Sequence, residues 1–354
     1  MYSRCVFPIL AAAASLSAQQ PAISNANLQT ASGAGGLEQA VRAAVGKQTG
    51  AAWIGYTVVK LPGDDQSCCW GGDGHGCGLE GNRRGSVQAS RSGPMQLEGP
   101  THVAVLLRAE QGQIGKIRPF TIDCPIDAGG LTLHWLTGVK AAESVAMLLR
   151  LAAAAEPVTG ERHGKSTVDS AVQALAMHAD PEAAAALDKL ATGSPSEKVR
   201  KSALFWLANS RGRPGFQTVA RLSREDPSDK VREHAVFALT QSSEPEAIAA
   251  IVRVAKEDKV PHVRGQALFW LAQRASKQLA SGAIGEALDQ DPDTEVKKKA
   301  VFALTQMPDD EGVPMLIRVA RSNPNAAVRK QAMFWLGQSK DTRALKFFED
   351  ILTK

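Results

Sequence analysis

The C-terminal half of the chain repeats one pattern of apolar positions. In the copies that begin at Val199, Val231, Val263, Val296 and Val328, Val, Ala and Leu stand at positions i, i+4 and i+8. This spacing predicts the buried stripe of an amphipathic helix. The copies lie 32 or 33 residues apart, and a weaker first copy stands at 167–177. A period between roughly 20 and 50 residues indicates a solenoid of stacked units.

Polar and proline residues divide the repeats. Asp226-Pro227-Ser228 and Asp291-Pro292-Asp293 precede two of the helices, and this combination ends one helix and caps the next. A second amphipathic segment follows each repeated stretch, most clearly at 245–258 and 311–322. The sequence therefore predicts a mostly α protein in which 139–354 forms a right-handed superhelix of helix pairs, opened by a helix near 139–155.

Position i+7 alternates between large and small residues, in the order Trp206, Ala238, Trp270, Ala303 and Trp335. By period this position joins the buried stripe. The alternation predicts a core in which consecutive repeats stack large against small, with a true unit of two repeats.

The repeated residues resemble the HEAT repeat family, including the short bacterial type of the phycobilin lyases. The matching positions are the Asp before the turn, the Val-Arg pair, and the following Ala and Leu. In one copy they are Asp226, Val231, Arg232, Ala235 and Leu239. The resemblance covers 167–354 and implies stacked antiparallel helix pairs.

The N-terminal half has strand patterns instead. Residues 53–59, 102–108, 114–122 and 131–136 are rich in β-branched and aromatic residues and are separated by turn signals. We expect a small antiparallel β domain over 50–138. The preceding 19–49 has no apolar period before Leu37, which predicts a flexible leader followed by a short helix.

Residues 1–18 have the form of a secretory signal peptide, with Arg4, an apolar run and a small-residue end at Ala18. The run is too short to span a membrane. We therefore expect an exported chain, periplasmic or extracellular, that is cleaved near Ala18. The net charge of +5, from 41 basic and 36 acidic residues, gives no reason to expect nucleic acid as a partner.

Export makes Cys68, Cys69, Cys77 and Cys124 disulfide candidates, and the spacing leaves the pairing open. Neighbouring Cys68 and Cys69 are poor partners for each other. Cys68, His75 and Cys77 with Asp73 are also ligand types for zinc, but the spacing differs from that of known zinc clips. We expect disulfides, with no metal and no cofactor.

The exposed side of the repeated helices carries the candidate partner-binding residues. Position i+6 carries an aromatic ring in all five copies, and position i+2 carries lysine in three of them. These residues are Phe205, Phe237, Phe269, Phe302, Phe334, Lys201, Lys298 and Lys330. The Phe rings either pack between repeats or form the floor of a concave groove. The amides at i+10, such as Gln273 and Gln306, can bond a peptide backbone.

A second series of cations, at i+1, consists of Arg200, Arg232, Arg264 and Arg329. In HEAT repeats this position usually pairs with the turn Asp, which favours a structural role over contact with an acidic partner. We expect a non-enzymatic scaffold that binds a protein or peptide on its concave surface. The alternative is an enzyme of the bilin lyase type. The resemblance also includes di-iron hydroxylases, which need repeated His-Glu pairs, but here only Glu233-His234 approaches one.

Overall fold

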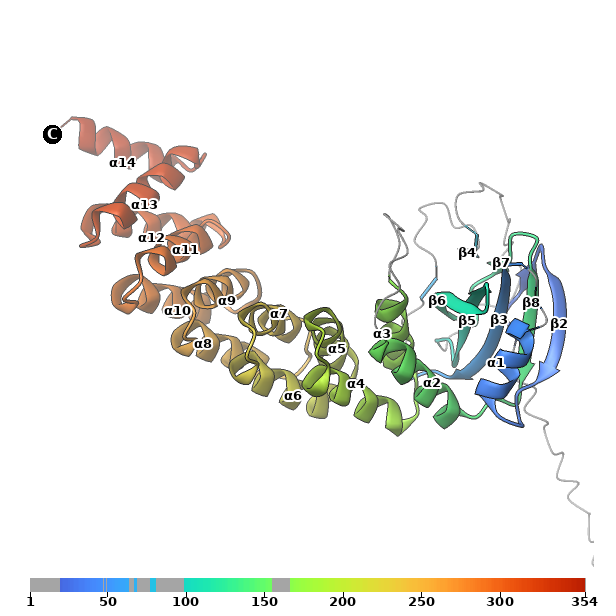
Figure 1. The fold of residues 1–354 in the computed structure, drawn as a ribbon. Helices are drawn as coiled ribbons and strands as arrows, with labels where there is room; N and C mark the ends of the chain where they lie inside the picture. The colour runs from blue at the N-terminus through green and yellow to red at the C-terminus, as the bar shows by residue number, and fades with distance from the viewer. Residues whose placement is uncertain are drawn as a thin grey trace, which may run out of the picture. The chain divides into compact units, whose positions relative to one another are not determined.

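The computed structural model describes residues 20–46, 48, 50–63, 67–68, 77–80, 99–154 and 166–353. They form two compact units that divide between Ser144 and Val145. The first unit contains the strands and the second contains the stacked helices (Figure 1). The prediction of a mostly α chain with a small N-terminal sheet is confirmed. The segment expected to be cleaved, 1–18, lies outside the described residues.

The N-terminal unit is built on a five-stranded sheet with the order β2-β8-β3-β5-β6. The strands are β2 (Asn27–Ser32), β3 (Ala52–Val59), β5 (His102–Glu110), β6 (Gln113–Thr121) and β8 (Thr132–Thr137). β3, β5 and β6 pair antiparallel, but β8 runs parallel to both β2 and β3. The sheet is therefore mixed and not wholly antiparallel as expected. The cause is helix α1 (Leu37–Gly46), which connects β2 to β3 as a crossover and leaves room for β8 between them.

The segment expected to be a flexible leader also contains strands. β1 (Ile23–Ser24) pairs with β7 (Ile126–Asp127), which also pairs with β4 (Cys77–Gly78), and β2 pairs with β8 along its whole length. All six residues of β2 are exposed, so the strand has no alternating apolar pattern that a sequence could show. Backbone pairing with β8 holds it in place.

Close packing around Gly55 fixes the centre of this unit. Trp53, Tyr56 and Trp135 are fully buried side chains of β3 and β8. A Cβ atom at Gly55 would lie 2.6 Å from the Trp135 ring, so only glycine admits the indole there. The Tyr56 hydroxyl lies 2.8 Å from the Ser144 hydroxyl, and burial raises the pKa of Tyr56. The core of the β unit therefore depends on two indoles and a glycine.

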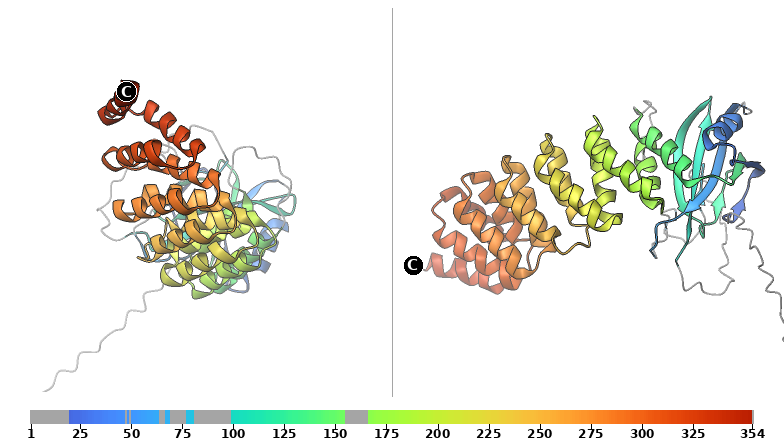
Figure 2. Two further views of the ribbon diagram at one scale, coloured as in Figure 1. Left: turned by 90° about the vertical axis from the view of Figure 1, so that its left-hand side faces the viewer. Right: turned by 90° about the horizontal axis from the view of Figure 1, so that it is seen from below.

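The second unit is a solenoid of helix pairs in two layers (Figure 2). After α2 (Ala141–Ala153), the first layer consists of α3 (Thr167–Met177), α5 (Glu197–Ser210), α7 (Asp229–Leu239), α9 (Pro261–Arg274), α11 (Thr294–Leu304) and α13 (Ala326–Gln338). The second layer consists of α4 (Pro181–Gly193), α6 (Gly212–Glu225), α8 (Ala247–Glu257), α10 (Lys277–Gln290), α12 (Asp309–Ser322) and α14 (Thr342–Leu352). Every described element between 196 and 340 is a helix, as the period predicts.

Five of the first-layer helices begin at a side-chain cap, and in four of them the cap bonds the first valine of the repeat. Ser196, Ser228, Asp293 and Asn325 each accept a hydrogen bond from the backbone N–H of the repeat's first valine. The cap fixes the valine in the first turn with its side chain in the core. The polar residues that divide the repeats in the sequence thus set the start of each helix.

Candidate functional site

The first-layer helices bury a wider stripe than positions i, i+4 and i+8. Position i+5 is also fully buried in four copies, at Leu204, Val236, Leu268 and Val301. Successive residues turn about 100° around the helix axis, so the buried stripe is centred away from i+7. Ala238 and Ala303 are still buried, but Trp206, Trp270 and Trp335 are half-buried. The expectation that the tryptophans fill the core is therefore wrong.

The tryptophans belong to an aromatic ladder along the first layer, formed by Phe205, Trp206, Phe237, Phe269, Trp270, Phe302, Phe334 and Trp335. Phe205 stacks on Phe237 and Phe269 on Phe302, each with ring centroids 6.0 Å apart. The intervening steps are made by Trp, with 5.1 Å from Phe237 to Trp270 and 5.3 Å from Phe302 to Trp335. Each Trp also contacts the Phe before it, edge to face. The alternation of Trp and Ala therefore reflects alternating ring contacts.

The ladder both packs between repeats and remains accessible. Phe205, Phe237, Phe269 and Phe302 are half-buried, and Phe334 is 55% exposed. Within each stacked pair one ring face is covered by the partner ring, so only part of each ring is accessible. These rings therefore combine inter-repeat packing with an accessible surface.

Charged side chains lie one helical turn from the ladder, toward the N-terminus of each helix. Position i+2 carries Lys201, Glu233, Lys298 and Lys330, and Gly265 in the third copy is covered by the stem of Lys299. Lys298 pairs with Glu295 at 2.8 Å, and Glu233 contacts His262 at 3.0 Å. The neighbouring His234 ring lies against Phe237, and burial, assisted by the charge of Lys201, lowers its pKa. This band is basic by three lysines to one glutamate.

The arginines at i+1 face the turns between repeats. Arg200, Arg232 and Arg264 form bidentate pairs with Asp226, Asp258 and Asp291, with closest distances of 3.0, 2.7 and 2.8 Å. The hydrogen bond to Asp258 raises the pKa of Arg232 despite its burial. Burial alone would raise the pKa of Asp291, but Arg264 and the backbone N–H of Asp293 lower it overall.

The fourth and fifth copies lack this pair. Lys297 bonds the Asp289 carbonyl, and Asn323 occupies the turn position of the aspartates. Arg329 donates to the carbonyls of Asn323 and Pro324. The arginines of the first three copies therefore have carboxylate partners within the array, which is the structural arrangement favoured from the sequence.

Other features of the array share the two-repeat period of the aromatic ladder. The Phe-Trp helices α5 and α9 have 14 residues, whereas the Phe-Ala helices α7 and α11 have 11. Arg211, directly after α5, and Arg274, the last residue of α9, each donate to carbonyls at the C-terminal end of the preceding first-layer helix. Ion pairs recur in the same phase, from Arg213 to Glu244 and from Lys277 to Asp310.

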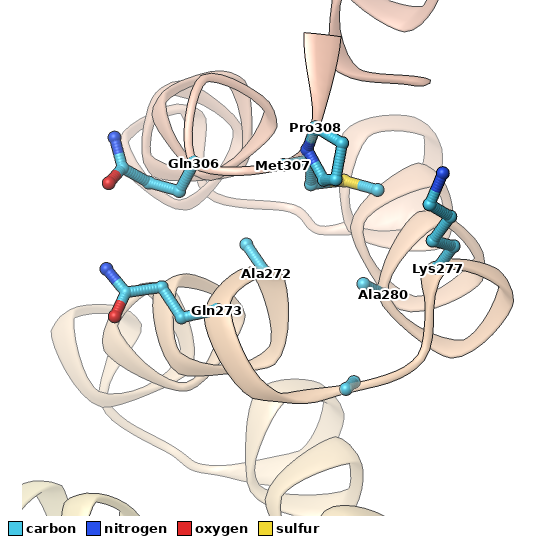
Figure 3. A pocket seen from close by; sticks show the side chains of 8 residues that line it. Ala272, Gln273, Lys277, Ala280, Gln306, Met307 and Pro308 are labelled. Carbon is cyan, nitrogen blue, oxygen red and sulfur yellow. The ribbon is translucent and has the colours of Figure 1, made fainter. Parts of the chain in front are cut away.

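The amides at i+10 line a pocket of about 550 Å³ between the third and fourth copies. Its walls are Ala272, Gln273, Ala275, Lys277, Ala280, Gln306, Met307 and Pro308. Gln273 and Gln306 run side by side, and their amide groups point away from Met307 and Lys277 (Figure 3). The pocket therefore combines an apolar floor with two outward-facing amides.

One repeat position of this region, i+9, was not recognised from the sequence. Thr240 and Thr305 stand at i+9, directly before the amides of the short helices, where the long helices have Ala208, Ala272 and Gly337. Each Thr hydroxyl donates to the carbonyl of the ladder Phe three residues earlier. The signal was available, since this position alternates in phase with Trp and Ala at i+7.

A disulfide joins Cys68 to Cys124 in the N-terminal unit. Cys77 is buried in the same core cluster, whereas Cys69, Asp73 and His75 lie outside the described residues. Cys68, Asp123 and Cys124 are the one described group of three side chains that could hold a metal, but two of its sulfurs are bonded to each other. A bonded sulfur is not a thiolate ligand.

Comparisons with known proteins identify the repeats. Residues 217–281 and 283–354 match the family model described as HEAT repeats. Solved structures similar to the chain include human deoxyhypusine hydroxylase in complex with glycerol, 17% identical over 60% of this chain and 80% of that one, with a TM-score of 0.30. A comparison with curated proteins finds no match.

Two further structures are the CpcE–CpcF complex of phycocyanin lyase from Nostoc sp. PCC7120 and Kap121p bound to Pho4p. The first is 20% identical over 45% of this chain and 100% of that one, with a TM-score of 0.33. The second is 16% identical over 55% of this chain and 24% of that one, also with a TM-score of 0.33.

Proposed function

Because residues 217–281 and 283–354 are HEAT repeats, we propose that the array is a scaffold whose aromatic ladder receives a protein or peptide partner. The observation that carries the proposal is a continuous line of half-buried rings across five repeats. Aromatic side chains that are packed on one side and open on the other are enriched in protein interfaces, because little conformational freedom remains to be lost on binding.

We further propose that the scaffold is exported. The form of residues 1–18 motivates this, and a disulfide within the β unit is compatible with an oxidising compartment. No helix in the described part of the chain is long and apolar enough to cross a membrane. N-terminal sequencing of the exported protein should find a start near Gln19, and an intact Met1 would contradict export by cleavage.

A binding scaffold accounts for the face better than an enzyme of the lyase type. The polar side chains beside the ladder are lysines and amides, and Glu233 is engaged with His262. These groups can recognise a partner by charge and hydrogen bonds.

Capture of partners from the exported fraction tests the scaffold. The intact chain is compared with Phe334→Ala, which removes a ring at the end of the ladder, and with Phe269→Ala, which interrupts the ladder in its middle. Leu279→Ala in α10 is the matched control, because Leu279 is 53% exposed but lies in the second layer. We expect both ladder variants to lose a protein that the intact chain and the control retain. Equal capture by all four proteins would contradict the scaffold.

A further inference from the structure

A hydrogen-bond relay at the end of α7 and of α11 fixes one glutamine in each case. Thr240 Oγ1 donates to the Phe237 carbonyl at 2.6 Å, and Gln241 Nε2 donates to Thr240 Oγ1 at 2.8 Å. The relay recurs one two-repeat unit later, with 2.7 Å from Thr305 to Phe302 and 3.0 Å from Gln306 to Thr305. The ladder and the amides are therefore physically linked.

The relay also determines which end of the glutamine side chain meets a partner. A threonine hydroxyl has a single proton, and here that proton goes to the phenylalanine carbonyl. The hydroxyl can then only accept, so each glutamine must present its NH₂ group to it. Oε1 of Gln241 and of Gln306 remains as an oriented acceptor.

Each oriented acceptor has a second amide at the same repeat position, i+10, of the preceding long helix. Gln273 is exposed and lies next to Gln306 at the pocket (Figure 3). Asn209 is the exposed equivalent on α5, which packs against the helix that ends before Gln241. An acceptor beside an amide that can donate matches the N–H and C=O groups of one extended peptide.

The rest of the face indicates what that peptide carries. The pocket between the two glutamines and Lys277 is lined by Ala272, Ala280 and Met307, which suits an apolar side chain. Lys277 is already paired with Asp310, so it adds little net charge there. The basic band at i+2 lies about 12 Å along the helix from i+10. A lysine of this band and an acidic side chain of a peptide held at i+10 can together span that distance. Lys298 is likewise paired with Glu295, so Lys201 and Lys330 supply the charge that favours acidic residues in the partner.

We propose that the amide pairs Asn209/Gln241 and Gln273/Gln306 hold the backbone of an extended, acidic peptide that runs along the array. This rests on the proposed scaffold function and names its partner class. Neighbouring helices lie about 9 Å apart, so two amide pairs two repeats apart are about 18 Å apart, and an extended chain covers this distance in roughly six residues. The peptide makes backbone contacts at two points separated by that interval.

A phage-displayed library of random 12-residue peptides, selected on the intact chain, supplies the probe. The best peptide is synthesised, and its affinity is measured for the intact chain, for Gln241→Ala/Gln306→Ala and for Thr240→Val/Thr305→Val. The threonine variant keeps both amides but removes the relay that orients them. Gln338→Ala is the matched control, because Gly337 precedes that amide and gives it no relay.

We expect the glutamine pair to weaken binding about tenfold or more, the threonine pair to weaken it several-fold, and the control to leave it unchanged. Single N-methylations of the peptide should be harmful at two positions roughly six residues apart. Unchanged affinity in both double variants would overturn the backbone contact. If Phe269→Ala still abolishes binding in that case, the scaffold stands without it. If no peptide is retained, or if none of these variants affects binding, both proposals fail.

Discussion

The Arg232 guanidinium and the Asp258 carboxylate form a bidentate pair in which the side chains are only 1% and 2% exposed. Arg232 also donates to the Asp226 carbonyl at 2.9 Å, so one guanidinium joins two successive turns. Removing one member of a buried pair leaves the other charge without compensation, which is costly.

Asp258→Ala should therefore lower the free energy of unfolding of the array by about 3–5 kcal/mol. Denaturant titration followed by far-ultraviolet circular dichroism measures it. Asp350→Ala is the control, because the Arg321–Asp350 pair is half exposed at 3.4 Å and should contribute less than about 1 kcal/mol. Similar losses in the two variants would show that burial of the first pair does not matter.

The Arg–Asp pair that the fourth copy lacks can be introduced by two substitutions. Lys297 and Asn323 occupy the positions of Arg264 and Asp291 in the next copy. The double variant Lys297→Arg/Asn323→Asp should have a free energy of unfolding about 1–2 kcal/mol higher than the sum of the two single effects predicts. Only the double variant completes the bidentate pair. A double-mutant cycle measures this coupling, and additive single effects would argue against it.

Trp270→Ala should cost less stability than Leu271→Ala. Leu271 is fully buried, so its truncation should cost about 2–5 kcal/mol, whereas the half-buried Trp270 loses mainly its ring contacts with Phe237 and Phe269. Thermal unfolding of the two variants gives the order. A larger loss for Trp270→Ala would restore the tryptophans to the core.

His178 should make stability depend on pH. It is fully buried, and burial lowers its pKa to about 4, with Asp180 opposing and Arg211 adding to the shift. The unfolded chain, with a histidine pKa near 6.5, then binds more protons between about pH 4 and 6.5. The free energy of unfolding is therefore unaffected by this histidine above pH 6.5, and it falls by about 3 kcal/mol as the pH falls from 6.5 toward 4. Unfolding free energies across this range should fall less steeply for His178→Gln. Parallel curves would mean that the imidazole does not titrate in this way.

The Cys68–Cys124 bridge closes a loop with a sequence separation of 56 and should stabilise the β unit by about 4 kcal/mol through the unfolded chain. Reduction should lower the melting temperature of the N-terminal unit and leave the helical array largely unchanged. Peptide mapping under non-reducing conditions should find the linkage. Four reactive thiols in protein from an oxidising compartment would exclude it.

The helical array was predictable because its information is local and repeated. The valine, alanine and leucine positions and the polar caps at Ser196 or Asp293 specify helices without knowledge of their neighbours. The placement of Trp270 was not, because the residue at i+5 is also buried and moves the centre of the buried stripe away from i+7. The alternation of Thr240 and Thr305 with small residues at i+9 marks the position in the sequence, but the hydrogen bond from the hydroxyl to the Phe237 carbonyl is visible only in the structure.

In the N-terminal unit, the pairing of strands could be predicted only in part from the sequence pattern. β3, β5 and β6 follow from their apolar content, but the parallel pairing of β2 with β8 joins segments about a hundred residues apart. β2 contributes backbone hydrogen bonds and no buried side chain, so nothing in NLQTAS distinguishes it from a loop.

The alternation of long and short first-layer helices constrains how such an array can change in length. Loss of one repeat, for example 231–262, would bring Phe205 and Trp206 against Phe269 and Trp270. Two Phe-Trp pairs would then meet where Phe205 and Trp206 now face Phe237 and Ala238. Loss of two repeats, for example 231–295, would instead place Phe205 and Trp206 against Phe302 and Ala303, so that a Phe-Trp helix would again meet a Phe-Ala helix. Duplication and deletion in this gene should therefore be tolerated in steps of about 64 residues, and half-steps should be selected against.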